Sequence, residues 1–125
     1  MRGTIATLLV TLVLGGSAAA SDWHAGEVER CDKQVSTADI VECVVGISDE
    51  WDVRLNLAWH GITTNLTGER REAFRDAQRK WITYRDANCD WYRSREGSVA
   101  EVEWIVCMLG MTRERVVEME NWLAR

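Results

Sequence analysis

The segment "AQRKWITYRDANC", residues 77–89, decides the fold because its residues recur at helical spacing. It contains no proline that would break a helix, and it ends at a cysteine that could bridge to a neighbouring element. Five of its residues follow steps of three and four, which places them on one face of a helix: Gln78, Trp81, Tyr84, Arg85 and Asn88. We therefore predict a helix with a polar strip beside its apolar face.

Two further segments show apolar residues at the same spacing. The first stripe is Ile40, Val44, Ile47, Trp51, Leu55, Ala58 and Ile62. The last stripe is Ile105, Met108, Thr112, Val116, Met119 and Leu123. Between them, the apolar face of the middle helix consists of Phe74, Ala77, Trp81, Tyr84 and Asn88. Sustained strand alternation is absent, so we expect an all-α fold, an up-down-up bundle of three long helices.

The expected helix ends follow from capping residues. Thr37 is a plausible N-cap for the first helix, Thr67 for the second, and Ser98 with Glu101 forms a capping box for the third. Gly46 weakens the first helix locally without ending it. Residues 21–36 form an irregular N-terminal arm before these helices.

The first twenty residues are typical of a secretory signal peptide. Arg2 precedes an apolar run from Ile5 to Leu14, and Ala18 and Ala20 supply the small residues of a cleavage site. The apolar run is shorter than the roughly 20 residues that a membrane-spanning helix needs. We therefore expect a mature domain of residues 21–125 that has no membrane span and is periplasmic or secreted.

The chain is acidic, with 15 Lys and Arg against 20 Asp and Glu and a net charge of −5. This balance argues against nucleic acid as a partner, because nucleic-acid binding relies on neutralising phosphates. It is compatible with a basic protein partner, since complementary charge steers association.

The four cysteines all lie after the predicted signal peptide, which in a small exported chain indicates two disulfides. If the second and third helices turn at residues 96–97, Cys89 and Cys107 lie at similar depth and can pair. Cys31 then pairs with Cys43 and folds the arm onto the first helix. No C-x-x-C motif occurs, so we expect no metal site and no cofactor.

The polar strip of the middle helix fits an interhelical hydrogen-bond network. We expect Arg85 to pair with Asp52 of the first helix, and Gln78 to pair with Asn56. The alternative is a catalytic Arg–Asp–Tyr cluster, but no nucleophile stands beside a recognisable base. The full predicted network is Asp52, Asn56, Gln78, Trp81, Arg85, Asp86, Thr112 and Arg115.

These residues also carry a family resemblance. The pattern combines D-x-x-L-N, A-Q-R-x-W-x-x-Y-R-D-x-x-C, G-S and C-x-x-x-x-T-x-x-R with two earlier cysteines. It resembles the LprI-like lysozyme-inhibitor family of small bacterial exported proteins. Trp59 stands where the family usually has Tyr, and Ile40 where Met is frequent. Matching positions are Cys31, Thr37, Cys43, Asp52, Leu55, Asn56, Ala77, Gln78, Arg79, Trp81, Tyr84, Arg85, Asp86, Cys89, Gly97, Ser98, Cys107, Thr112 and Arg115.

The resemblance implies a helical, disulfide-bonded envelope protein that binds a protein partner, with lysozyme as the candidate. One alternative is a periplasmic interaction or envelope-stress module that does not inhibit lysozyme. A carboxylate-dependent hydrolase using Asp52 and Asp86 ranks far below both, so we expect no enzyme. Aromatic residues at the bundle ends could instead be packing. The candidate binding residues are Trp23, Asp49, Glu50, Trp91 and Tyr92.

Overall fold

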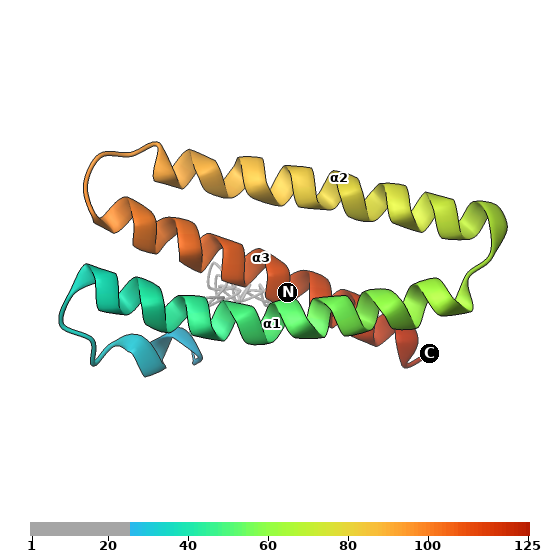
Figure 1. Ribbon diagram of the computed structural model, residues 1–125, viewed down its shortest axis with the longest axis horizontal. Coiled ribbons are helices and arrows are strands. Elements are labelled where there is room, and N and C mark those ends of the chain that lie inside the picture. The colour runs from blue at the N-terminus through green and yellow to red at the C-terminus, as the bar shows by residue number, and fades with distance from the viewer. Residues whose placement is uncertain (1–25) are drawn as a thin grey trace, which may run out of the picture.

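The computed structural model describes residues 26–125. The predicted signal peptide and Trp23 lie outside the described residues, so the domain boundary after residue 20 stays a prediction. A 3-10 turn, η1 (Val28–Cys31), precedes the helices α1 (Thr37–Asn65), α2 (Gly68–Arg93) and α3 (Val99–Leu123). The three helices run up, down and up (Figure 1). The predicted all-α fold is confirmed, and residues 26–125 contain no strand.

The central element of the bundle is α3. It packs extensively against α1 and also against α2, whereas α1 and α2 touch each other at few points. Figure 1 shows α3 between the other two helices in that view, with α2 set apart from α1. The three helices therefore do not share one symmetric core.

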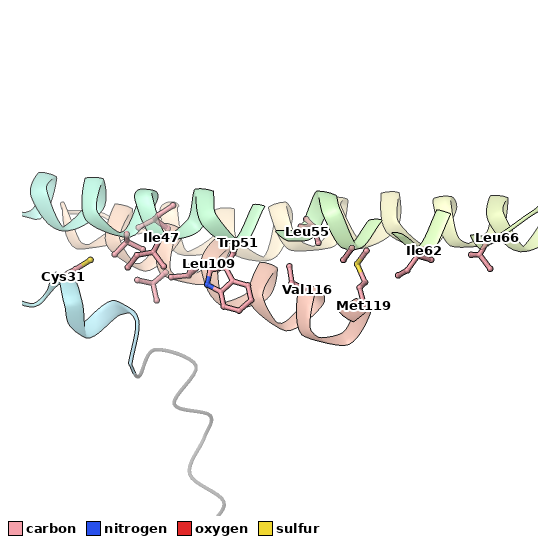
Figure 2. Close-up of a cluster of buried hydrophobic side chains, with 13 residues drawn as sticks. Cys31, Ile47, Trp51, Leu55, Ile62, Leu66, Leu109, Val116 and Met119 are labelled. Atoms are coloured by element: carbon pink, nitrogen blue, oxygen red, sulfur yellow. The ribbon is translucent and has the colours of Figure 1, made fainter. Parts of the chain in front are cut away.

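The apolar core lies mainly between α1 and α3. On α1 it follows the predicted stripe, from Val44 through Trp51 to Ile62, and ends at Leu66. On α3 it includes Ile105, Val106, Leu109, Val116 and Met119. Figure 2 shows the side chains along α1 turned toward α3, with Cys31 of the arm at one end of the row. In contrast, α2 buries only Gln78 and Cys89.

Two of the three predicted capping arrangements are wrong. Ser36 caps α1 in place of Thr37, because Ser36 has an extended backbone that lets its hydroxyl accept the Asp39 N–H at 3.1 Å. Ser98 occupies the N-cap position of α3 but makes no side-chain cap hydrogen bond, since its own backbone is already helical. Glu101 pairs instead with Arg93 at 3.3 Å, so the capping box does not form.

The third capping residue has the predicted position without the predicted bond. Thr67 is the N-cap of α2, but its side chain makes no cap hydrogen bond. Gly68 follows with a φ of 54°, a conformation that glycine adopts without steric cost.

Both predicted disulfides are confirmed. Cys31 bonds to Cys43 with 5.8 Å between the Cα atoms, and Cys89 bonds to Cys107 with 5.6 Å between them. The first bridge ties the arm to α1, and the second ties α2 to α3. By the chain-entropy model, closing loops of this length stabilises the fold by roughly 3 kcal/mol per bridge.

A side-chain hydrogen bond also anchors the arm. Trp51 Nε1 of α1 donates to Glu27 Oε2 at 2.6 Å, and the Arg54 guanidinium lies 3.9 Å from the centroid of the Trp51 ring. Arg54 in turn donates to both carboxylate oxygens of Glu120 on α3, at 3.0 and 2.6 Å. The arm, α1 and α3 are thereby linked through Trp51 and Arg54.

None of the helices in residues 26–125 combines the length and the apolar character that a membrane span requires.

We predict that Gly46→Ala stabilises the protein by about 1 kcal/mol, which raises Tm by roughly 4–8 °C in a domain of this size. Gly46 lies inside α1, is exposed, and a Cβ added there would meet nothing within 4 Å. Thermal unfolding followed by circular dichroism measures the change. Gly97→Ala is the control of opposite sign, because Gly97 has a φ of 99° that an L-residue rarely adopts. A Gly46→Ala protein that melts earlier than the parent would contradict the prediction.

Candidate functional site

The polar strip of α2 makes its interhelical hydrogen bonds with α3. Arg85 NH1 donates to Thr112 Oγ1 at 3.2 Å, and the Arg85 Nε donates to Asp86 Oδ1 at 2.9 Å. Arg115 of α3 donates from Nε to Gln78 Oε1 at 3.0 Å. We call this set the α2–α3 seam: Gln78, Trp81, Arg85, Asp86, Thr112 and Arg115.

The Trp81 ring contacts both guanidinium groups of the seam. The Trp81 ring centroid lies 5.1 Å from Cζ of Arg85 and 5.8 Å from Cζ of Arg115. Both arginine side chains are largely buried, with 13% of each exposed. Cation–π contacts of this kind strengthen when they are partly desolvated, so the ring helps to hold both positive charges at the interface.

Glu118 is a seam residue that the sequence analysis missed. Its Oε2 accepts from Arg115 NH1 at 2.7 Å, across a spacing of three residues on α3. The sequence could have predicted this ion pair, because residues three apart on a helix are neighbours. The pair places a carboxylate next to each buried arginine, Asp86 for Arg85 and Glu118 for Arg115.

The expected pairing of Arg85 with Asp52 is wrong. Arg85 pairs with Asp86 and Thr112, and Gln78 bonds to Arg115 rather than to Asn56. The reason is the splayed arrangement, in which α2 packs on α3 and meets α1 at few points. Asp52 and Asn56 are consequently exposed on α1. Asn56 does line a pocket of about 250 Å³ with Gln78, between α1 and α2.

Tyr84 was also assigned wrongly to the inner face of the middle helix. It is 62% exposed, because α2 contacts one neighbour along a narrow strip and leaves the flank of that strip in solvent. Asn88, its neighbour in the predicted face, is partly buried and points its amide toward the sulfurs of Cys107 and Met111. Tyr84 is therefore a surface residue and takes no part in a catalytic cluster with Arg85.

The charge of Arg85 acts on one carboxylate of α1, Asp52, and on one of α2, Asp86. Although Asp52 is exposed overall, partial desolvation raises the pKa of its carboxyl above the ordinary value of 3.8. The positive charge of Arg85 lowers the Asp52 pKa, and the negative charge of Asp49 raises it. Asp86 pairs directly with Arg85.

Charge is divided along the length of the bundle. The contacts of Cys89 with Cys107 and of Gln78 with Arg115 set the register of α2 on α3, and Gly61 lies beside Leu123. The half that contains residues 26–53 and 81–114 carries fourteen Asp and Glu against six Lys and Arg, a net charge of −8. The other half, residues 54–80 and 115–125, carries five against eight, a net charge of +3.

Four of the predicted binding residues lie in this acidic half. Asp49 and Glu50 are exposed on α1. Trp91 is 64% exposed on α2 and meets Tyr92 edge to face, with 5.1 Å between the ring centroids. The two pairs sit on helices that make few contacts with each other, so they do not form a single cluster.

The part of the chain that the structure describes contains no candidate metal site. Among residues 26–125, no group of three or more His, Cys, Asp or Glu side chains is placed to hold a metal ion. All four cysteines are consumed in disulfides.

The seam predicts a clear stability effect. Arg85→Ala should lower the free energy of unfolding by about 2 kcal/mol, since it leaves the buried Thr112 hydroxyl without its charged partner. Chemical denaturation measures the loss. Lys80→Ala is the matched control, because Lys80 pairs with Asp76 on the exposed face of α2 and should cost no more than about 0.5 kcal/mol. Equal effects of the two variants would contradict a structural role for the seam.

The raised pKa of Asp52 predicts a pH-dependent stability. An acid whose pKa is higher in the folded state stabilises the fold below its unfolded pKa, and that contribution is lost as pH rises through the folded pKa. Asp52→Asn cannot ionise, so it should melt at a higher temperature than the parent at pH 7. The difference should shrink at about pH 3, where Asp52 is protonated in both states. Thermal melts of both proteins at the two pH values test this, and a variant that is less stable at pH 7 would contradict it.

Comparison with known proteins assigns the chain to a family. The family model described as "Lysozyme inhibitor LprI" matches residues 30–119. No curated protein and no solved structure gave a significant match. The matched range contains both disulfides, all three helices except the last turn of α3, and every residue of the seam. The family resemblance inferred from the sequence is therefore confirmed, and this chain belongs to the LprI lysozyme-inhibitor family.

Proposed function

We propose that this protein is exported and that it binds a lysozyme through its acidic half, so that the enzyme cannot reach the cell wall. The observation that carries the proposal is the family match over residues 30–119. Two disulfides in a chain of this size support export, because such bridges persist in oxidising compartments. The predicted signal peptide is consistent with the same destination.

The charge distribution supports the acidic half as the docking surface. A net charge of −8 over one end of the bundle would attract a basic enzyme and orient it before contact. Asp49 and Glu50 are exposed on α1 there, and the negative charge of Asp49 acts on the Asp52 carboxyl. Electrostatic complementarity of this kind raises the association rate and suppresses wrong partners.

Trp91 adds an exposed apolar side chain to this charged surface. Exposed tryptophans are frequent anchors at protein interfaces, because they bury a large area with little loss of conformational freedom. At 64% exposure, Trp91 contributes little to the core, so its side chain is available to a partner. Tyr92 braces it from the side, which limits the rotamers that binding would have to freeze.

The proposal assigns no catalytic step to this chain. A glycosidase needs two facing carboxyl groups at a defined separation across a substrate-binding cleft. Here Asp86 is paired with Arg85, and a cavity of about 250 Å³ between α1 and α2 is lined by Arg75 and Arg79 and by no acid. An interaction module without lysozyme inhibition remains the second candidate, since the same acidic surface fits any basic protein.

The test is inhibition of a purified chicken-type lysozyme acting on suspended bacterial cell walls. The parent protein should slow clearing at micromolar excess. The double variant Asp49→Lys with Glu50→Lys should weaken inhibition by roughly tenfold at low salt, because it reverses charge in the acidic half. Added salt should weaken the parent's inhibition in the same direction.

A matched control makes the same change of charge elsewhere. Glu69→Lys with Glu72→Lys alters two exposed acids at the start of α2, in the half of opposite charge, and should leave inhibition unchanged. If the parent binds a basic protein from envelope extract but never slows lysozyme, the interaction module replaces the inhibitor. Equal loss of inhibition in both double variants would contradict the acidic half as the contact surface.

A further inference from the structure

A groove opens at the opposite end of the bundle from the acidic half. It has a volume of about 580 Å³ and lies where the end of α1, the start of α2 and the end of α3 meet. Its floor is apolar, because Ile62, Leu66 and Met119 contribute buried side chains to it. Phe74 and Trp122 form walls, and Trp122 is 43% exposed. We call this the turn-end groove.

Small residues on α2 create the space. Ala73 and Ala77 line the groove at a spacing of four residues, so both face the gap between α2 and α3. Larger side chains at these positions would extend into the groove. The two alanines therefore set the width of the cavity, and neither of them belongs to the seam.

The rim of the turn-end groove is positive. Arg70, Arg115 and Arg125 line it together with a single acid, Glu118. Arg115 already pairs with Glu118 at 2.7 Å, so that acid is neutralised. Arg70 is exposed and makes no ion pair within residues 26–125, which leaves its guanidinium available. This half of the bundle carries a net charge of +3, so its field also favours an anion.

We propose that the turn-end groove binds an amphiphile with one carboxylate and a single apolar chain, a fatty acid. The apolar floor would take the chain, and Arg70 with Arg125 would hold the carboxylate at the rim. The volume falls in the range of small-molecule sites, which are mostly apolar cavities with a few polar groups that fix orientation. This site is separate from the acidic half and does not depend on lysozyme binding.

Dodecanoate at submicellar concentration is the probe. It should bind the parent protein in isothermal titration calorimetry and raise its Tm, because a ligand that binds only the folded state stabilises it. Dodecyltrimethylammonium has the same chain with the opposite charge and should bind much more weakly. Equal binding of the two probes would overturn the proposal, since the arginine rim would then play no part.

Substitutions in α2 locate the site. Ala77→Leu should weaken dodecanoate binding by roughly tenfold or more, because it fills the cavity. Ala87→Leu is the matched control, an equal change at an exposed position of the same helix outside the groove, and should bind as the parent does. Arg70→Gln should weaken dodecanoate binding by up to about fivefold, because it removes one exposed ion pair with the carboxylate. The Tm of the ligand-free protein should not fall, since Arg70 is exposed.

Other occupants give different outcomes. If the parent protein is dimeric in solution and Ala77→Leu makes it monomeric, a second copy fills the groove and the fatty-acid proposal fails. Unchanged dodecanoate binding by a folded Ala77→Leu protein would also overturn it. Lysozyme inhibition by Ala77→Leu should equal that of the parent, so failure here and failure of the proposed inhibitor function are told apart.

Discussion

The packing of α3 against both other helices is the constraint on which the rest of the structure depends. A domain of about a hundred residues has a thin core. Here most of the buried apolar side chains lie between α1 and α3. The remaining helix, α2, buries little apolar area and meets α1 at few points. Its position is fixed instead by one disulfide to α3 and by the buried arginines of the seam.

This gives a structural reason for the polar residues of α2 through which the sequence resembles the family. An apolar interface tolerates exchange of one aliphatic side chain for another, because volume and polarity are kept. A seam of buried arginines does not, because removing either partner leaves a charge or a hydroxyl unsatisfied. Gln78, Trp81 and Arg85 therefore fix α2 against α3, and under the proposed function the surface that meets a partner lies elsewhere on the helices.

Sequence reasoning succeeded where one periodic signal was sufficient. The stripes on α1 and α3 appeared as expected except for Leu123, which is 39% exposed at the end of α3. Both helices bury a broad apolar face. The disulfide pairing followed from the depth of each cysteine relative to a turn. Reasoning failed for Tyr84 and for the pairing of Arg85 with Asp52, because periodicity gives the face of a helix but not which neighbour covers it. The ion pair of Glu118 with Arg115 follows from their spacing of three residues on a helix, but it was not predicted.

The placement of the disulfides suggests how two sites can share so small a molecule. Both bridges lie in the acidic half, where they tie the arm to α1 and α2 to α3. A surface braced in this way loses little conformational freedom on docking, which favours binding to a rigid protein such as an enzyme. Within residues 26–125, the opposite half has no disulfide and is held by side-chain packing and by polar pairs such as Arg54 with Glu120 and Arg115 with Gln78. Covalent cross-links are thus confined to the half of negative charge, and under the fatty-acid proposal the turn-end groove lies where the described helices carry no disulfide.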